Sequence, residues 1–115
     1  MKKLDLTWEI LDTKGAVATQ KYSKTIEENG VEKEILETQP VTVGRIIADC
    51  VLYEIADPKK ITEKEHLQRY DIFERVRGKE QAEFSQDEID FIKRLVIRRC
   101  MPIWAGQVLR IINQE

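Results

Sequence analysis

The first clear pattern along the chain is a strict alternation of apolar and polar positions near the start. The apolar members fall on one face of an extended strand, and they are Leu4, Leu6, Trp8 and Ile10. Residues 12–15, Asp-Thr-Lys-Gly, follow with turn-forming types, because aspartate suits the first turn position and glycine a left-handed one. The pattern therefore predicts a strand over residues 4–10 that reverses into a second strand.

Two more strands follow this turn. Residues 16–28 supply the second strand, and Asn29-Gly30 is a strong hairpin signal because both residues tolerate the positive φ of a type I′ turn. Residues 31–36 return as the third strand. Residues 1–38 thus predict a β-meander with two hairpins.

The second hairpin is heavily charged. Its charged side chains are Lys21, Lys24, Glu27, Glu28, Glu32, Lys33, Glu34 and Glu37. Such charges keep a hairpin in water or protect a sheet edge from pairing with other chains. The alternative is a docking arm, because an extended strand pair can add to a partner's sheet while its charges select the partner.

After Gln39-Pro40 the apolar period changes from two to about 3.6, which marks the start of a helical part. Thr42 begins the first helix, and Asp57-Pro58 ends it. Its apolar positions cover much of the circumference: Val43, Ile46, Ile47, Cys50, Val51, Leu52, Tyr53 and Ile55. A helix of this kind is expected at the centre, covered on more than one side.

A second helix is predicted from Thr62, which has capping-box spacing with Glu65, to about Arg77, with Gly78 as its stop. Its expected inward side chains are Leu67, Tyr70, Phe73 and Val76.

Two further helices complete the chain. Ser85 and Glu88 repeat the capping-box spacing and start the third helix, and Pro102 suits the first turn of a fourth that runs to the chain's end. The expected inward side chains are Ile89, Ile92, Leu95 and Val96 on the third helix, and Trp104, Val108, Ile111 and Ile112 on the fourth.

These elements predict one α+β domain over residues 1–115, with a β-meander at 1–38 and a compact four-helix part at 41–115. Hydrophobic residues make up 42% of the chain and charged residues 35%, a balance that favours folding over disorder. Nineteen Lys and Arg against 21 Asp and Glu give a net charge of -2, so nucleic acid is not the expected partner.

The expected compartment is the cytoplasm. Asp5 and Glu9 interrupt the start before any continuous apolar run, which is unlike a signal peptide, and no stretch approaches the ~20 apolar residues of a membrane span. Cys50 and Cys100 are isolated in apolar stretches and lack the paired spacing of zinc motifs. We expect both to be reduced core side chains, and we expect no cofactor.

The sequence offers no catalytic constellation. His66 is the sole histidine, and Glu63 and Glu65 do not share a helix face with it, so it is expected to be a solvated surface side chain. Thr62 and Ser85 are explained as helix caps rather than nucleophiles. The five glycines are scattered and form no phosphate loop. The chain is therefore predicted not to be an enzyme.

A basic cluster supports an alternative function. Arg94, Arg98 and Arg99, close to Lys93, could contact phosphates if the third and fourth helices formed a helix-turn-helix, with Arg75, Arg77 and Lys79 adding charge. This hypothesis gives a DNA-binding regulator. The simpler interpretation is that basic residues complement a helix C-terminus, as the acidic residues Asp87, Glu88 and Asp90 complement its N-terminus.

Both tryptophans are expected in the core, since Trp8 and Trp104 lie on apolar stripes. The alternative is that one of them anchors a partner, because tryptophan is enriched at interface hot spots. The candidate interaction surface is formed by Met101, Ile103 and Trp104 around Pro102, where apolar groups gather at a helix start.

The stretch from Val41 to the end resembles small phage and prophage proteins. The shared features are a Thr-x-Gly helix start at Thr42, a Ser-x-x-Glu-Ile helix at Ser85, and a closing Pro-Ile-Trp-Ala-Gly-Gln segment at 102–107. The charged hairpin around Asn29-Gly30 departs from that pattern. The resemblance implies an accessory protein of virion or tail assembly, located in the bacterial host or on the virion.

We therefore expect a non-enzymatic protein that acts by binding another protein, with a homo-oligomer as one form of that binding. The partner's identity does not follow from the sequence.

Overall fold

A computed structural model describes residues 1–55 and 57–114. Within these residues the elements are β1 (Lys2–Asp5), β2 (Thr19–Glu28), β3 (Val31–Pro40), α1 (Val43–Tyr53), the 3-10 turn η1 (Pro58–Lys60), α2 (Glu63–Val76), β4 (Gln81–Phe84), α3 (Gln86–Arg99) and α4 (Pro102–Ile112). The predicted α+β class is confirmed, and so is the order of N-terminal strands followed by four helices. We call β2 and β3 the arm and the remaining described residues the body.

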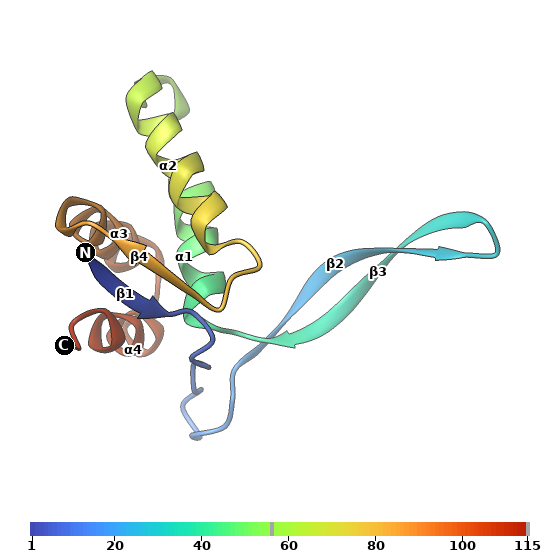
Figure 1. Cartoon of the computed structure of the whole chain (residues 1–115). Helices are drawn as coiled ribbons and strands as arrows, with labels where there is room; N and C mark the ends of the chain where they lie inside the picture. Colours follow the sequence, from blue (N-terminus) through green and yellow to red (C-terminus); the bar gives the residue numbers. More distant parts are fainter. Residues whose placement is uncertain (56, 115) are drawn as a thin grey trace.

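The pairing of the first strand differs from the predicted meander. Strand β1 pairs antiparallel with β4, so that Lys2 lies opposite Phe84 and Asp5 opposite Gln81, while β2 pairs with β3. Figure 1 shows β1 and β4 side by side in the body and the β2–β3 hairpin apart from them. The alternation near the start indicates a strand but not its partner, and β4 is a short strand that was not predicted.

Both predicted reversals are present. The Asp12 carboxylate accepts hydrogen bonds from the amides of Lys14 and Ala16, at 2.8 and 3.0 Å, and Gly15 has φ +80°. Asn29 and Gly30 have φ values of 54° and 78°, as a type I′ turn requires. Strand β3 extends four residues further than predicted, to Pro40, and β2 begins three residues later than predicted, at Thr19.

Trp8 is not a core residue, although Leu4, Leu6 and Ile10 are buried as predicted. The Asp5 carboxylate accepts hydrogen bonds from both the amide and the hydroxyl of Thr7, which makes a tight local turn. Strand β1 therefore ends at Asp5, and the alternation of faces does not continue through the next residues. Trp8 is left 49% exposed.

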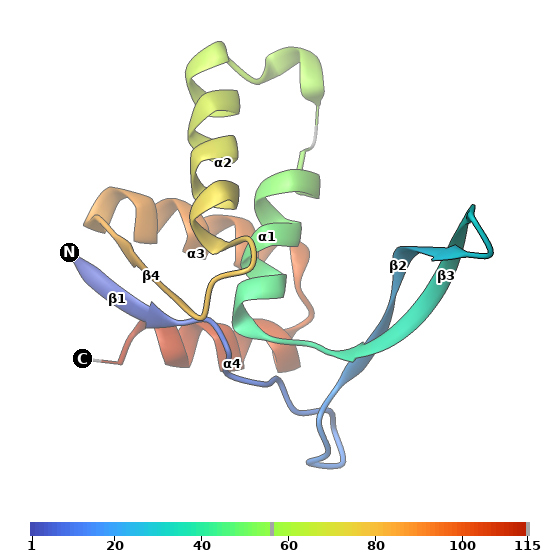
Figure 2. The ribbon, with the colours of Figure 1, turned by 45° about the vertical axis from the view of Figure 1, so that its right-hand side comes forward.

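Helix α1 is central, as predicted. The Thr42 hydroxyl caps it by accepting a hydrogen bond from the Arg45 amide at 3.2 Å. Six of its residues are buried: Val43, Gly44, Ile46, Ile47, Cys50 and Val51. They lie in a single core with side chains of β1, α2, β4, α3 and α4. Figure 2 shows α2, α3 and α4 gathered around α1.

The predicted inward face of α2 is confirmed for Phe73 and Val76 and is wrong for Leu67 and Tyr70. Ile72 and Val76 are buried and Phe73 packs against the core, but Leu67 and Tyr70 point outward and are exposed. The inward position is occupied by Arg69, which is 6% exposed. A prediction from the apolar pattern places every arginine on the outward face. Because Arg69 is buried, the predicted inward face of α2 is displaced from the observed one.

Arg69 satisfies polar groups at the end of α1. Its Nη1 atom donates to the carbonyl of Val51 at 3.1 Å and approaches that of Cys50 at 3.5 Å. Its guanidinium also forms ion pairs with Glu54 at 3.9 Å and Glu65 at 3.6 Å. The buried charge is thus paired and hydrogen-bonded, and α2 is joined to the C-terminal end of α1.

The caps of the other helices match the prediction. The Thr62 hydroxyl accepts from the Glu65 amide, and Ser85 and Glu88 form a complete capping box. Gly78, with φ +66°, follows the end of α2. Pro102 is the first residue of α4, which ends at Ile112, and Glu115 lies outside the described residues.

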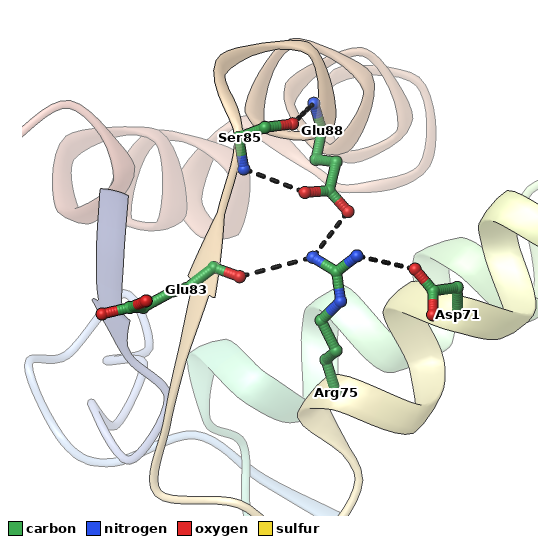
Figure 3. A network of polar contacts seen from close by, with 5 residues as sticks. All are labelled: Asp71, Arg75, Glu83, Ser85 and Glu88. Atoms are coloured by element: carbon green, nitrogen blue, oxygen red, sulfur yellow. Dashed lines mark hydrogen bonds and ion pairs between the residues drawn. The ribbon is translucent and has the colours of Figure 1, made fainter. Parts of the chain in front are cut away.

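A second arginine joins α2 to the start of α3. Arg75 forms ion pairs of 2.6 Å with both Asp71 and Glu88, and its Nη1 atom approaches the Glu83 carbonyl of β4 at 3.4 Å (Figure 3). Burial alone would raise the pKa of Glu88, but hydrogen bonds from Arg75 and Ser85 outweigh burial and lower it below its ordinary value. The same carboxylate therefore serves both the cap and the contact between helices.

Gly44 is needed for close packing of α1 on the chain after β1. A Cβ atom at this position would lie 3.0 Å from the Leu6 Cβ and 3.1 Å from the Leu6 carbonyl oxygen. We expect Gly44→Ala to lower the free energy of unfolding by about 1–3 kcal/mol, the usual cost of overpacking. Urea denaturation followed by circular dichroism measures this change.

Gly106 is the matched control, because it lies inside α4 and a Cβ atom there would meet nothing within 4 Å. Gly106→Ala should raise the free energy of unfolding by about 0.5–1 kcal/mol through helix propensity. Equal effects of the two substitutions would contradict the packing assigned to Gly44.

The Arg75–Glu88 contact predicts a pH dependence. The folded-state pKa of Glu88 is lowered, so its stabilisation is present above the ordinary glutamate pKa and is lost as pH falls through the folded value. Glu88→Gln should lower stability at pH 7 by roughly 1–3 kcal/mol, and the difference from wild type should shrink below about pH 4.

Glu83→Gln is the control for this experiment, because only the backbone carbonyl of Glu83 faces Arg75 and its exposed carboxylate points away (Figure 3). Thermal melts from pH 3 to pH 7 compare the variants. A deficit of Glu88→Gln that stays constant over this range would show that the carboxylate's charge does not stabilise the fold.

Candidate functional site

The residues considered for chemistry hold structural positions. Thr62 and Ser85 cap helices, and His66 is exposed on α2, as predicted. Over residues 1–55 and 57–114, no group of three or more His, Cys, Asp and Glu side chains is placed to hold a metal ion. In the same part of the chain, no helix is long and apolar enough to cross a membrane.

The arm is the feature that separates this molecule from a compact domain. Its two ten-residue strands leave the body together and run outward as a twisted ribbon (Figures 1 and 2). The Cα radius of gyration is 15.5 Å, against about 13 Å for a compact chain of this length. Most arm side chains are exposed, which agrees with the prediction that this charged hairpin projects into water.

The register of the arm gives it two unlike faces. One face carries Tyr22, Ile26 and Ile35, which are all half-buried. The other face carries Leu36, which is 69% exposed, and exposed acidic side chains at Glu27, Glu32 and Glu34. Within the described residues, β2 and β3 pair with no other strand, so each has a free edge of backbone donors and acceptors.

Contacts at its base fix the arm to α1. The guanidinium carbon of Arg45 lies 3.9 Å from the centre of the Tyr22 ring, and its Nη2 atom donates to the Gln39 side-chain oxygen at 2.9 Å. Farther out, Lys24 and Glu37 form an ion pair of 3.3 Å across the strands. One arginine on the first turn of α1 therefore holds both strands where they leave the body.

The corner predicted as an interaction surface is divided between core and solvent. Met101 is 62% exposed, while Ile103 is half-buried and Trp104 packs partly against the core. Met101 and Trp104 line a pocket of about 350 Å³ whose wall also includes Gln20, from the base of the arm. The corner is thus next to the arm, and Met101 is its exposed member.

The basic residues of the DNA-binding hypothesis are only partly together. Arg94, Arg98 and Arg99 are exposed on α3. Arg75 and Arg77 belong instead to ion pairs with acidic residues of their own helix and of α3. Helix α4, the second helix of the proposed motif, buries its apolar residues in the core. The exposed basic face that remains therefore consists of the arginines of α3, Arg94, Arg98 and Arg99.

The two cysteines are core side chains, but they are not isolated. Cys50 is buried in α1 and Cys100 is half-buried at the end of α3, and their Sγ atoms are only 4.0 Å apart. Both lie in the wall of the pocket beside Met101. Their separation of fifty positions in the sequence gave no signal for this proximity.

No protein-family model matches this chain, and comparisons with curated proteins and with solved structures gave no match either.

The partial burial of Trp104 gives it a structural contribution that Met101 lacks. We expect Trp104→Ala to lower the free energy of unfolding by about 2 kcal/mol or more, because its removal opens a gap beside the core. Met101→Ala should change it by less than about 0.5 kcal/mol, as is usual for an exposed side chain. Chemical denaturation of both variants measures the difference, and similar values would show that Trp104 is not packed.

Proposed function

We propose that this protein is a non-enzymatic accessory protein of a phage or prophage, which binds another protein during virion or tail assembly. The observation that supports a binding role is the arm, two ten-residue strands that pair with each other and stand off the body. The phage connection rests on the resemblance of the helical part, at Thr42, Ser85 and residues 102–107.

The arm supports a binding role because a two-stranded hairpin without further contacts has a low folding stability, which a partner could raise. Such hairpins are only marginally stable in water, since they bury little apolar surface. The arm keeps Leu36, in its middle, and Val31, at its tip, exposed, and it leaves backbone groups of both strands unpaired. A partner that added a strand to one edge would satisfy those groups and cover the apolar side chains.

The charges of the arm would select that partner. Glu27, Glu28, Glu32 and Glu34 surround the turn at its tip, with Lys33 as the one cation among them. A surface that receives the tip should therefore be basic, and binding should weaken as salt increases. A second copy of this chain is one form of partner, because α3 ends in exposed arginines.

The register of the hairpin allows a clean test. Tyr22 lies opposite Glu37 and Glu28 opposite Val31, six pairs apart, so both pairs are of the same type in the ladder. Deleting residues 23–28 and 31–36 leaves Asn29-Gly30 to close the hairpin between Tyr22 and Glu37. The shortened arm keeps its contacts with Arg45 and loses its outer part.

This deletion is expected to leave the melting temperature of the body unchanged and to weaken complex formation. Full-length and shortened chains would be co-expressed with the products of the flanking genes, and complexes measured by light scattering and by titration. We expect at least a tenfold loss of affinity, about 1.4 kcal/mol, for a virion or tail protein.

Leu67→Ala serves as the control for exposed apolar surface, since Leu67 is exposed on α2, away from the arm. It should bind like the wild type. Equal binding by the shortened chain, or substrate turnover by the purified protein, would overturn the proposal.

A further inference from the structure

Cys50 and Cys100 meet at one edge of the core. Cys50 lies on α1 and is 1% exposed, whereas Cys100 is the C-cap residue of α3 and is half-buried. Their Sγ atoms are 4.0 Å apart, close enough for one thiol to donate a hydrogen bond to the other. A disulfide bond is about 2 Å long, so the two sulfurs need to approach by roughly 2 Å to form one.

The backbone gives the two thiols unequal freedom. Cys50 lies within α1, where Arg69 holds the carbonyls of Cys50 and Val51. Cys100 has left the helix, with φ -93° and ψ 146°, and lies in the short link before Pro102 begins α4. The Cys100 side chain can therefore move toward Cys50 without breaking a helix.

The environment also gives the thiols unequal reactivity. The hydrogen bond from Cys50 lowers the pKa of Cys100, and the Arg99 guanidinium adds to this effect against the opposing effect of burial. The hydrogen bond to Cys100 and burial both raise the pKa of Cys50. Cys100 is thus the thiol of the pair that loses its proton more readily.

A pocket of about 350 Å³ opens onto the pair. Its wall includes Asp49, Cys50, Arg99, Cys100, Met101 and Trp104. Because Cys100 is half-buried and Cys50 is buried, Cys100 is the more accessible residue of the pair for a small molecule that enters the pocket.

We propose that Cys50 and Cys100 form a thiol–disulfide exchange site whose reactant is a small-molecule disulfide of the glutathione class. The proposal goes beyond the binding role of the arm and does not depend on it. Cys100 is the attacking residue, and Cys50 is the resolving residue.

The exchange has two steps. Cys100 loses its proton to water, and its thiolate attacks one sulfur of the small disulfide. A mixed disulfide forms as the bond between the two small-molecule sulfurs breaks, and the first small thiolate leaves and takes a proton from water. Cys50 then loses its proton to water, and its sulfur attacks Cys100 Sγ. The mixed disulfide breaks, and the second small thiolate leaves and is protonated. Two protein thiols are oxidised to one disulfide, and the small disulfide is reduced to two thiols.

The test uses the full chain in buffers with increasing ratios of oxidised to reduced glutathione, quenched with acid and measured by intact mass. The wild-type monomer should lose the mass of two hydrogens and retain no glutathione. Its two free thiols should fall to zero and return with dithiothreitol. Two free thiols in fully oxidised glutathione, or a link only between chains, would overturn the proposal.

Single variants test the order of attack. Cys50→Ser removes the resolving thiol, so Cys100 should keep one glutathionyl group. Cys100→Ser leaves the enclosed Cys50, which should stay unmodified in the folded chain and react after unfolding in guanidinium chloride. Circular dichroism checks that both variants fold, and the wild-type mass change does not depend on either. Equal modification of both folded variants would exclude Cys100 as the attacking residue.

Discussion

The wide apolar face of helix α1 has to be covered by more than one neighbour, because six of its eleven residues are buried. Helices α2 and α3 and the chain after β1 provide that cover, the last by a contact so close that a Cβ atom at Gly44 would lie 3.0 Å from the Leu6 Cβ. The helix ends then lie close to the core, where unpaired backbone groups are costly. Thr42 satisfies one end, and Arg69 reaches from α2 to satisfy the other. Burying α1 therefore fixes its neighbours in place.

Local signals explain what could be predicted of this fold. A cap such as Ser85 with Glu88 depends on residues three apart, and the Asn29-Gly30 turn depends on the φ values that two adjacent residues tolerate, so the sequence predicts both. The β1–β4 pairing joins segments far apart, and no local pattern names the partner of a strand. The inward positions predicted for Leu67 and Tyr70 of α2 are wrong, because a polar residue such as Arg69 is expected to face outward and is instead buried.

In the candidate site, too, features set by local sequence could be predicted, and features set by contacts between distant segments could not. Charge and turn chemistry predict a hairpin in water over residues 16–36, and the structure places such a hairpin at residues 19–40. The meeting of Cys50 with Cys100 depends instead on how α1 packs against the end of α3, which spacing along the chain does not reveal. The turn made by Asp5 and Thr7 likewise decides the exposure of Trp8 against an apolar alternation.

The arm and the thiol pair both depend on α1. Arg45, on the first turn of α1, stacks on Tyr22 and so fixes the direction in which the arm leaves the body. Five residues later the same helix carries Cys50, and Gln20 at the base of the arm lines the pocket onto which the thiols open. Beyond this base the arm has no core of its own, and its strands are held by each other. A rigid body that fixes only the base of such an arm leaves its outer part free to adapt to a partner's surface, which is the property that a docking element requires.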